Sequence, residues 1–118
     1  MGVRVLAAGM TVFHATDSRS KLTRLRGPMW LAKSRGHAGS FGRTVHTFET
    51  TRALRLWPLE SAVVPAPGLP LDMSIFLPRD RVIAAVRAAG YDGTVLYAGD
   101  PSEEIMLLEP KDALRRIG

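Results

Sequence analysis

The most restrictive feature of this sequence is a series of short strand-like runs separated by glycine, proline and polar residues. Six runs are rich in β-branched, aromatic and other apolar side chains, as strands are: Thr11–Thr16, Met29–Ala32, Thr44–Thr50, Ala53–Trp57, Thr94–Ala98 and Glu104–Leu108. A helical period is clearest over Arg79–Ala89, where one face is apolar and Gly90 follows. Because strands do not alternate regularly with helices, the chain is predicted to be an α+β domain rather than a doubly wound parallel sheet.

The connecting segments are predicted mostly as loops. Asp17–Pro28 is polar and basic, and Gly99-Asp100-Pro101-Ser102 is a turn between the last two strands. Ser34–Gly42 contains three glycines, so a helix there is short and marginal. Pro58–Pro78 contains five prolines and is expected to be irregular, with Met73–Leu77 as one short strand inside it. Pro110–Ile117 begins a last helix, since proline is tolerated at the first helical position.

Length and composition limit the class of protein. The 118 residues fit one domain spanning 1–118, and 46% apolar side chains supply a core. The absence of cysteine excludes disulfides and thiolate metal sites, and the three histidines lack zinc-ligand spacing, so no metal is expected. No apolar run approaches the roughly 20 residues of a membrane span. We therefore expect a cytoplasmic protein with no membrane partner, although a domain of a larger secreted effector would have the same composition.

Charge is distributed unevenly around a net value of +5. Residues 1–55 hold ten lysines and arginines against two acids, whereas the remainder holds six against nine. A basic half favours a phosphate-rich partner, either a dinucleotide or a nucleic acid, and an alternative interpretation is a solvated arginine-rich face. Because the sequence lacks a Gly-x-Gly-x-x-Gly after its first strand and a Walker-type loop, neither of these phosphate-binding loops is expected.

Three segments carry a resemblance through their order and spacing. They are Val12-Phe13-His14-Ala15-Thr16; then Met29-Trp30-Leu31-Ala32-Lys33-Ser34 with Ala38-Gly39-Ser40-Phe41-Gly42; and finally Gly90-Tyr91-Asp92-Gly93-Thr94 with Glu103-Glu104-Ile105-Met106-Leu107-Leu108-Glu109-Pro110. Together they make the chain resemble the ADP-ribosyltransferase superfamily, in its diphtheria-toxin and poly-ADP-ribose-polymerase branch and among its small bacterial and phage members. The resemblance spans about residues 9–117, apart from the proline-rich segment. It implies an ADP-ribosyltransferase-like split β-sandwich with NAD as the substrate.

The resemblance assigns roles to two residues that are far apart in the sequence. Glu104 would bind a ribose hydroxyl and stabilise the cation that forms when nicotinamide leaves. His14 follows Val12 and Phe13 at a strand end, where a neutral imidazole suits a ribose hydroxyl. From the residues alone, Glu104 is also interpretable as a solvated turn acid like Glu103, and His14 as a core histidine.

Two aromatic residues would hold nicotinamide. Trp30 and Phe41 occupy positions where the family usually has tyrosines, and stacking needs only a flat aromatic surface. Both residues also suit an ordinary core. The sequence departs from the arginine-specific branch of the family, because Ser102 lies two residues before Glu104 and the paired Glu-x-Glu is absent.

The remaining predicted NAD-binding residues lie near these four. Ala15 replaces the usual glycine after His14, and Thr16 keeps the hydroxyl of the family's motif. Ser34 ends the second strand segment. Arg24 belongs to a basic loop whose side chains suit the NAD pyrophosphate or are simply solvated; the other members are Arg19, Lys21 and Arg26.

The predicted function is cleavage of NAD by a mono-ADP-ribosyltransferase or NAD glycohydrolase, with transfer of ADP-ribose to an unidentified protein or nucleic-acid acceptor. Such a domain would be a toxin, a phage effector or a member of a toxin–antitoxin pair, in which an antitoxin is the partner. Two alternatives remain open. One is a nucleic-acid-directed enzyme, including an RNA 2′-phosphotransferase, which the basic half would suit. The other is a catalytically silent module that binds NAD or a partner on the same fold.

Overall fold

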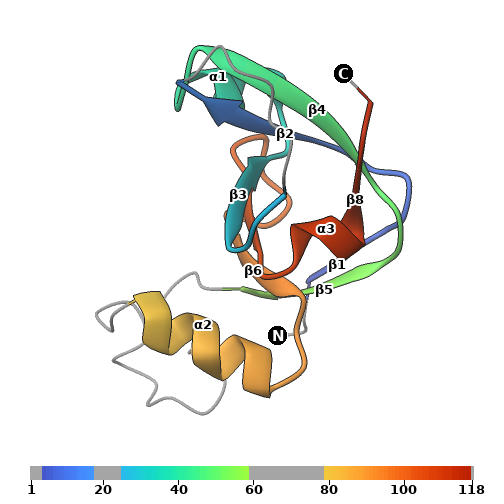
Figure 1. Cartoon of the computed structure of the whole chain (residues 1–118), viewed down its shortest axis with the longest axis vertical. Coiled ribbons are helices and arrows are strands. Elements are labelled where there is room, and N and C mark those ends of the chain that lie inside the picture. The colour runs from blue at the N-terminus through green and yellow to red at the C-terminus, as the bar shows by residue number, and fades with distance from the viewer. Residues whose placement is uncertain (1–3, 18–24, 59–78, 118) are drawn as a thin grey trace.

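The computed structural model describes residues 4–17, 25–58 and 79–117, whose strands form one curled eight-stranded sheet (Figure 1). The order across the sheet is β1-β5-β6-β7-β3-β2-β4-β8. Neighbouring strands are antiparallel except β5 and β6, which are parallel. The predicted α+β class is confirmed. The strands are β1 (Arg4–Leu6), β2 (Thr11–Thr16), β3 (Met29–Ala32), β4 (Thr44–Thr50), β5 (Leu54–Pro58), β6 (Gly93–Leu96), β7 (Glu104–Leu107) and β8 (Leu114–Arg116).

Three helices accompany the sheet in the described part of the chain: α1 (Arg35–Gly39), α2 (Arg79–Ala88) and α3 (Pro110–Ala113). Figure 1 shows α1 near β2 and β4 at one end of the molecule, and α2 near β5 and β6 at the other. The helix predicted over Arg79–Ala89 is therefore confirmed. It ends before Gly90, whose φ of +84° suits a residue without a Cβ atom.

The strand β7 is buried on both faces, although it lies in a sheet that is mostly antiparallel. Ile105 and Leu107 point into the main core, whereas Met106 packs with Val86 of α2 in a second cluster. Burial on both faces fixes the position of this strand, and with it the position of Glu104 at its start. The main core also contains Leu6, Val12, Met29, Leu31, Phe48, Leu54, Leu56, Val95, Ala113 and Leu114.

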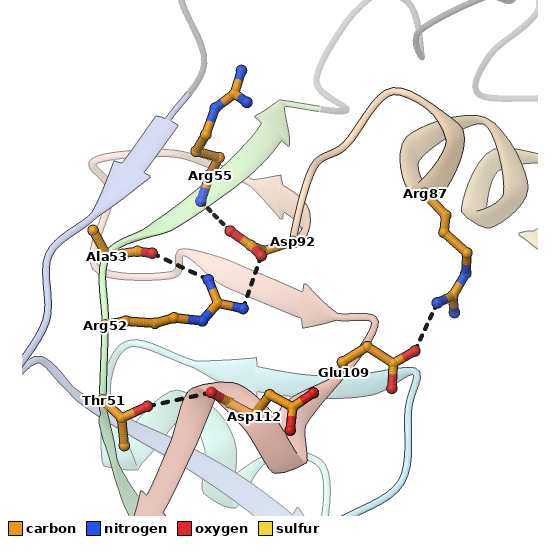
Figure 2. Close-up of polar contacts among 8 residues, drawn as sticks. All are labelled: Thr51, Arg52, Ala53, Arg55, Arg87, Asp92, Glu109 and Asp112. Atoms are coloured by element: carbon orange, nitrogen blue, oxygen red, sulfur yellow. Dashed lines mark hydrogen bonds and ion pairs between the residues drawn. The ribbon is translucent and has the colours of Figure 1, made fainter.

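The residues between α2 and β6 hold β6 against its neighbours. The Asp92 carboxylate accepts a hydrogen bond from the Arg55 backbone N–H at 2.8 Å and one from the Arg52 guanidinium at 3.0 Å (Figure 2). A Cβ atom on Gly93 would lie 1.8 Å from the Met106 carbonyl oxygen, which is closer than any real contact. The Asp-Gly pair of the sequence motif therefore has a structural use at the junction of β5, β6 and β7.

Two segments differ from the sequence predictions. The helix predicted over Pro110–Ile117 ends at Ala113, and β8 follows it and pairs with β4. Burial of Leu114 and pairing with β4 outweigh the weak local preference for helix. The strand β1 was not predicted, because Arg4–Leu6 offers too few residues for a periodic pattern. Of the irregular segment predicted over Pro58–Pro78, Pro58 ends β5, and the rest, including the strand at Met73–Leu77, lies outside the described residues.

Candidate functional site

A cavity of about 340 Å³ opens where β2 and β3 separate. The register joins these two strands through one residue pair, Phe13 with Ala32, whereas β2 and β4 pair along six residues. Residues from the middle of both strands therefore line the cavity. The lining residues come from β2, β3, β6, β7, α1 and the segment after α1: Phe13, His14, Ala15, Trp30, Leu31, Ala32, Ala38, Phe41, Leu96 and Glu104.

Strand register explains why Glu104 faces this cavity. Glu104 pairs with Leu96 on one side and with Ala32 on the other, and Ala32 pairs in turn with Phe13. Directly paired residues point to the same face of a sheet, so these four side chains form one row across β6, β7, β3 and β2. Glu104 is the charged member of an otherwise apolar row.

His14, which also lines the cavity, has a defined tautomer. Its Nδ1 atom lies 2.6 Å from the Trp30 carbonyl oxygen, across the gap between β2 and β3. Because a carbonyl oxygen only accepts, Nδ1 carries the proton and donates this hydrogen bond. In the neutral ring, Nε2 is then a hydrogen-bond acceptor. The same hydrogen bond holds the imidazole plane against β3.

The Glu104 carboxylate is partly enclosed and has a histidine neighbour. Its side chain is 20% exposed, and its Oε1 atom lies 3.5 Å from Nε2 of His37. His37 lies in α1, which begins at Ser34, whose Oγ atom accepts a hydrogen bond from the His37 backbone N–H at 3.0 Å. Phe41, which is 60% exposed, contacts the His37 ring edge to face, with the ring centroids 5.2 Å apart.

Glu103 is wholly buried, which corrects its interpretation as a solvated turn acid. One carboxylate oxygen accepts a hydrogen bond from the Gly99 backbone N–H at 2.5 Å, and the other lies 3.5 Å from the Arg4 guanidinium. The Glu103 carbonyl oxygen accepts from the Lys33 N–H at 3.1 Å. These contacts tie the turn before β7 to β1 and to the end of β3, and so fix the backbone that presents Glu104.

The structure brings five of the eight predicted site residues to one cavity, places two elsewhere and does not describe the eighth. His14, Ala15, Trp30, Phe41 and Glu104 line the cavity. The Trp30 side chain also packs against the cluster under α2, so it serves partly as core. The other three are Ser34, which caps α1; Thr16, which contacts His46; and Arg24, which lies outside the described residues.

Thr16 belongs to a polar chain beside the cavity. Arg116 donates to Nδ1 of His46 at 2.8 Å, so Nε2 of His46 carries the proton and donates to Thr16 Oγ1 at 3.1 Å. Burial lowers the pKa of His46 below its usual value, and the charges of Arg116 and His14 lower it further. This hydrogen bond ties β2 to β4, and the contact of Thr16 with NAD stays a prediction.

Sequence reasoning missed His37, which it treated as one of three scattered histidines. A usable signal was its spacing: His37 is three residues after the capping Ser34 and four residues before Phe41. Residues four apart are neighbours on a helix, and the turn that follows α1 keeps Phe41 beside His37. Placing Phe41 in the site therefore implied that His37 lies beside it.

Searches for other kinds of site and for relatives gave negative results. Among the described residues, no three histidine, aspartate or glutamate side chains gather as a metal site would require. Within the same residues, no helix has the length and apolar character needed to cross a membrane. Comparisons with protein-family models, with curated proteins and with solved structures each found no match to this chain.

Proposed function

We propose that the cavity binds the nicotinamide–ribose end of NAD and that the domain cleaves the bond between nicotinamide and ribose. ADP-ribose then passes to a macromolecular acceptor, or to water in a glycohydrolase reaction. One observation carries the proposal: His14 and Glu104, which are 90 positions apart in the sequence, line the same cavity together with two aromatic residues.

In the proposed reaction, the C–N bond between ribose C1′ and the pyridinium nitrogen breaks, and its electron pair leaves with neutral nicotinamide. The ribose is left with an oxocarbenium-like positive charge. The acceptor or a water molecule then donates an electron pair to C1′ and releases a proton. The Glu104 carboxylate meets the developing charge, and a fixed charge in a partly enclosed site stabilises it more strongly than water would.

Binding is assigned to the other cavity residues. Nε2 of His14 accepts a hydrogen bond from a ribose hydroxyl, because Nδ1–H already donates one to the Trp30 carbonyl oxygen. Trp30 and Phe41 offer flat apolar surfaces to nicotinamide. The cavity volume lies near the lower end of the range for ligand sites, which suits one end of a dinucleotide rather than the whole molecule.

The proposed fold type is an ADP-ribosyltransferase-like split β-sandwich. The single residue pair between β2 and β3 supports it, since so short a ladder leaves the two halves of the curled sheet free to diverge. The order of the motifs along the chain supports the same interpretation, because their side chains meet at this divergence.

The test is an assay in which the purified protein is incubated with NAD and the released nicotinamide is measured by chromatography. We expect Glu104→Gln to lower turnover by about 100-fold or more, as loss of a transition-state contact does. The KM for NAD should change little, because the carboxylate acts on charge that appears late. Glu109→Gln is the matched control, since Glu109 is an exposed carboxylate that pairs with Arg87 outside the cavity (Figure 2).

Two outcomes would contradict the proposal. Equal nicotinamide release by the wild type and Glu104→Gln would remove Glu104 from its role. Absence of release and of transfer by the folded wild type, with protein and nucleic-acid fractions offered as acceptors, would leave only a silent NAD-binding or partner-binding module. Labelled NAD identifies the acceptor, and a steep loss of labelling with added salt would indicate a nucleic acid.

A further inference from the structure

The contact between α1 and β7 joins a second titratable side chain to the proposed catalytic group. Nε2 of His37 lies 3.5 Å from Oε1 of Glu104, and the two side chains are 27% and 20% exposed. That nitrogen is buried and makes no hydrogen bond to another described group. A buried polar atom without a partner is costly, and the Glu104 carboxylate is the acceptor within its reach.

We propose that His37 is a positioning residue, whose Nε2–H holds the Glu104 carboxylate in the orientation that meets the substrate. The inference rests on the proposed NAD cleavage. At 3.5 Å the contact is longer than an ordinary hydrogen bond, so a small rotation of either side chain completes it. Nε2 donates both in the protonated ring and in the neutral Nε2–H tautomer, and the role does not require a change of charge.

Two contacts position His37, one through its backbone and one through its ring. Its backbone N–H is held by Ser34, and its ring meets Phe41 edge to face with planes at 89°. Asp100, in the turn between β6 and β7, is a carboxylate close enough to be influenced by the charges of His37 and Lys33. Glu104 is therefore held through its backbone by the Glu103 contacts and through its side chain by α1.

Substitution by glutamine, asparagine and alanine tests the role of a single nitrogen. The glutamine amide reaches the place of Nε2, whereas the shorter asparagine amide reaches only that of Nδ1. We expect His37→Asn and His37→Ala to lower kcat for nicotinamide release about tenfold, the effect of one hydrogen bond to a charged group. KM for NAD should stay within about twofold, and His37→Gln should recover most of kcat. Arg35→Ala, an exposed change in the same helix, should leave both constants unchanged.

A double-substitution cycle separates positioning from a general effect on folding. In the Glu104→Gln background, His37→Asn should have no further effect on kcat, because both changes act through one carboxylate. If His37→Asn costs the same factor in both backgrounds, or if all three variants match the wild type, the positioning role is wrong. The thermal midpoint of each variant reports folding, and the asparagine and glutamine pair remains informative if the alanine variant unfolds.

Failure of this inference is distinguishable from failure of the proposed function. When the wild type releases nicotinamide, Glu104→Gln does not and the His37 variants equal the wild type, only the role of His37 is overturned. When the folded wild type releases no nicotinamide and transfers no ADP-ribose, the proposed function is wrong and the role of His37 falls with it.

Discussion

Substitution of His14 by asparagine or by glutamine distinguishes the contribution of Nδ1 to stability from that of Nε2 to substrate binding. An asparagine amide lies where Nδ1 lies and keeps a donor toward the Trp30 carbonyl oxygen. A glutamine amide lies near Nε2 and removes that donor. Because the observed Nδ1–O distance is 2.6 Å and the contact is partly buried, the two variants should differ in stability as well as in substrate binding.

The expected magnitudes follow from ordinary hydrogen-bond energies. One such bond contributes about 1 kcal/mol net to the free energy of unfolding. For a chain of 118 residues, this is a change of about 4 °C in the thermal midpoint. An Nε2 contact to the ribose of the same strength, when lost, raises the KM for NAD by about fivefold.

Circular dichroism on heating and the kinetics of nicotinamide release measure these quantities. His14→Asn should unfold within about 2 °C of the wild type and show a KM raised about fivefold. His14→Gln should unfold about 4 °C lower and bind NAD more nearly as the wild type does. Equal midpoints for the two variants would refute the structural role of Nδ1. Equal KM values would refute the assignment of Nε2 to the substrate.

Three further predictions concern stability. Asp92→Ala should cost about 1–2 kcal/mol in urea unfolding, and Arg52→Ala under about 1 kcal/mol, because the former removes the hydrogen bond to the Arg55 backbone as well as the ion pair with Arg52. Equal costs would contradict this. Gly93→Ala should cost at least about 2 kcal/mol, since its Cβ atom meets the Met106 carbonyl; an unchanged midpoint would refute the packing. As pH falls through about 6.5, His46 is protonated in the unfolded chain but stays neutral in the folded protein, where its pKa is lowered. This difference stabilises the unfolded state relative to the folded one. Stability should therefore fall less steeply in His46→Gln, and identical pH profiles would contradict this.

Much of the fold was predictable because its strands carry local signals. The runs that became β2, β3 and β4 have β-branched or apolar residues next to turn residues, and the structure reproduces their bounds. β8 was not predictable in this way. Its Leu114–Arg116 segment continues a helical pattern, and only the exposed edge of β4, which no local window contains, draws it into the sheet.

The candidate site was partly predictable for a similar reason. His14 and Glu104 stand at recognisable places on strands, and the fold brings both residues to the lining of one cavity. Thr16 and Ser34 have hydroxyls that suit many uses, and in the structure they accept hydrogen bonds from His46 and from the His37 backbone at the start of α1. The burial of Glu103 was not predictable, since it depends on Arg4, which lies 99 positions away.

The place of β7 between β6 and β3 has a consequence for biosynthesis. Ala32 pairs with Glu104 across this junction, so every residue from β3 to β7 must have been synthesised before the cavity has its acidic wall. Pairings so distant along the chain form late, since the intervening loop must be closed first. A nascent or truncated chain that stops before β7 has an open slot in the middle of its sheet. A chain that ends before β7 therefore lacks the acidic side chain that lines the cavity.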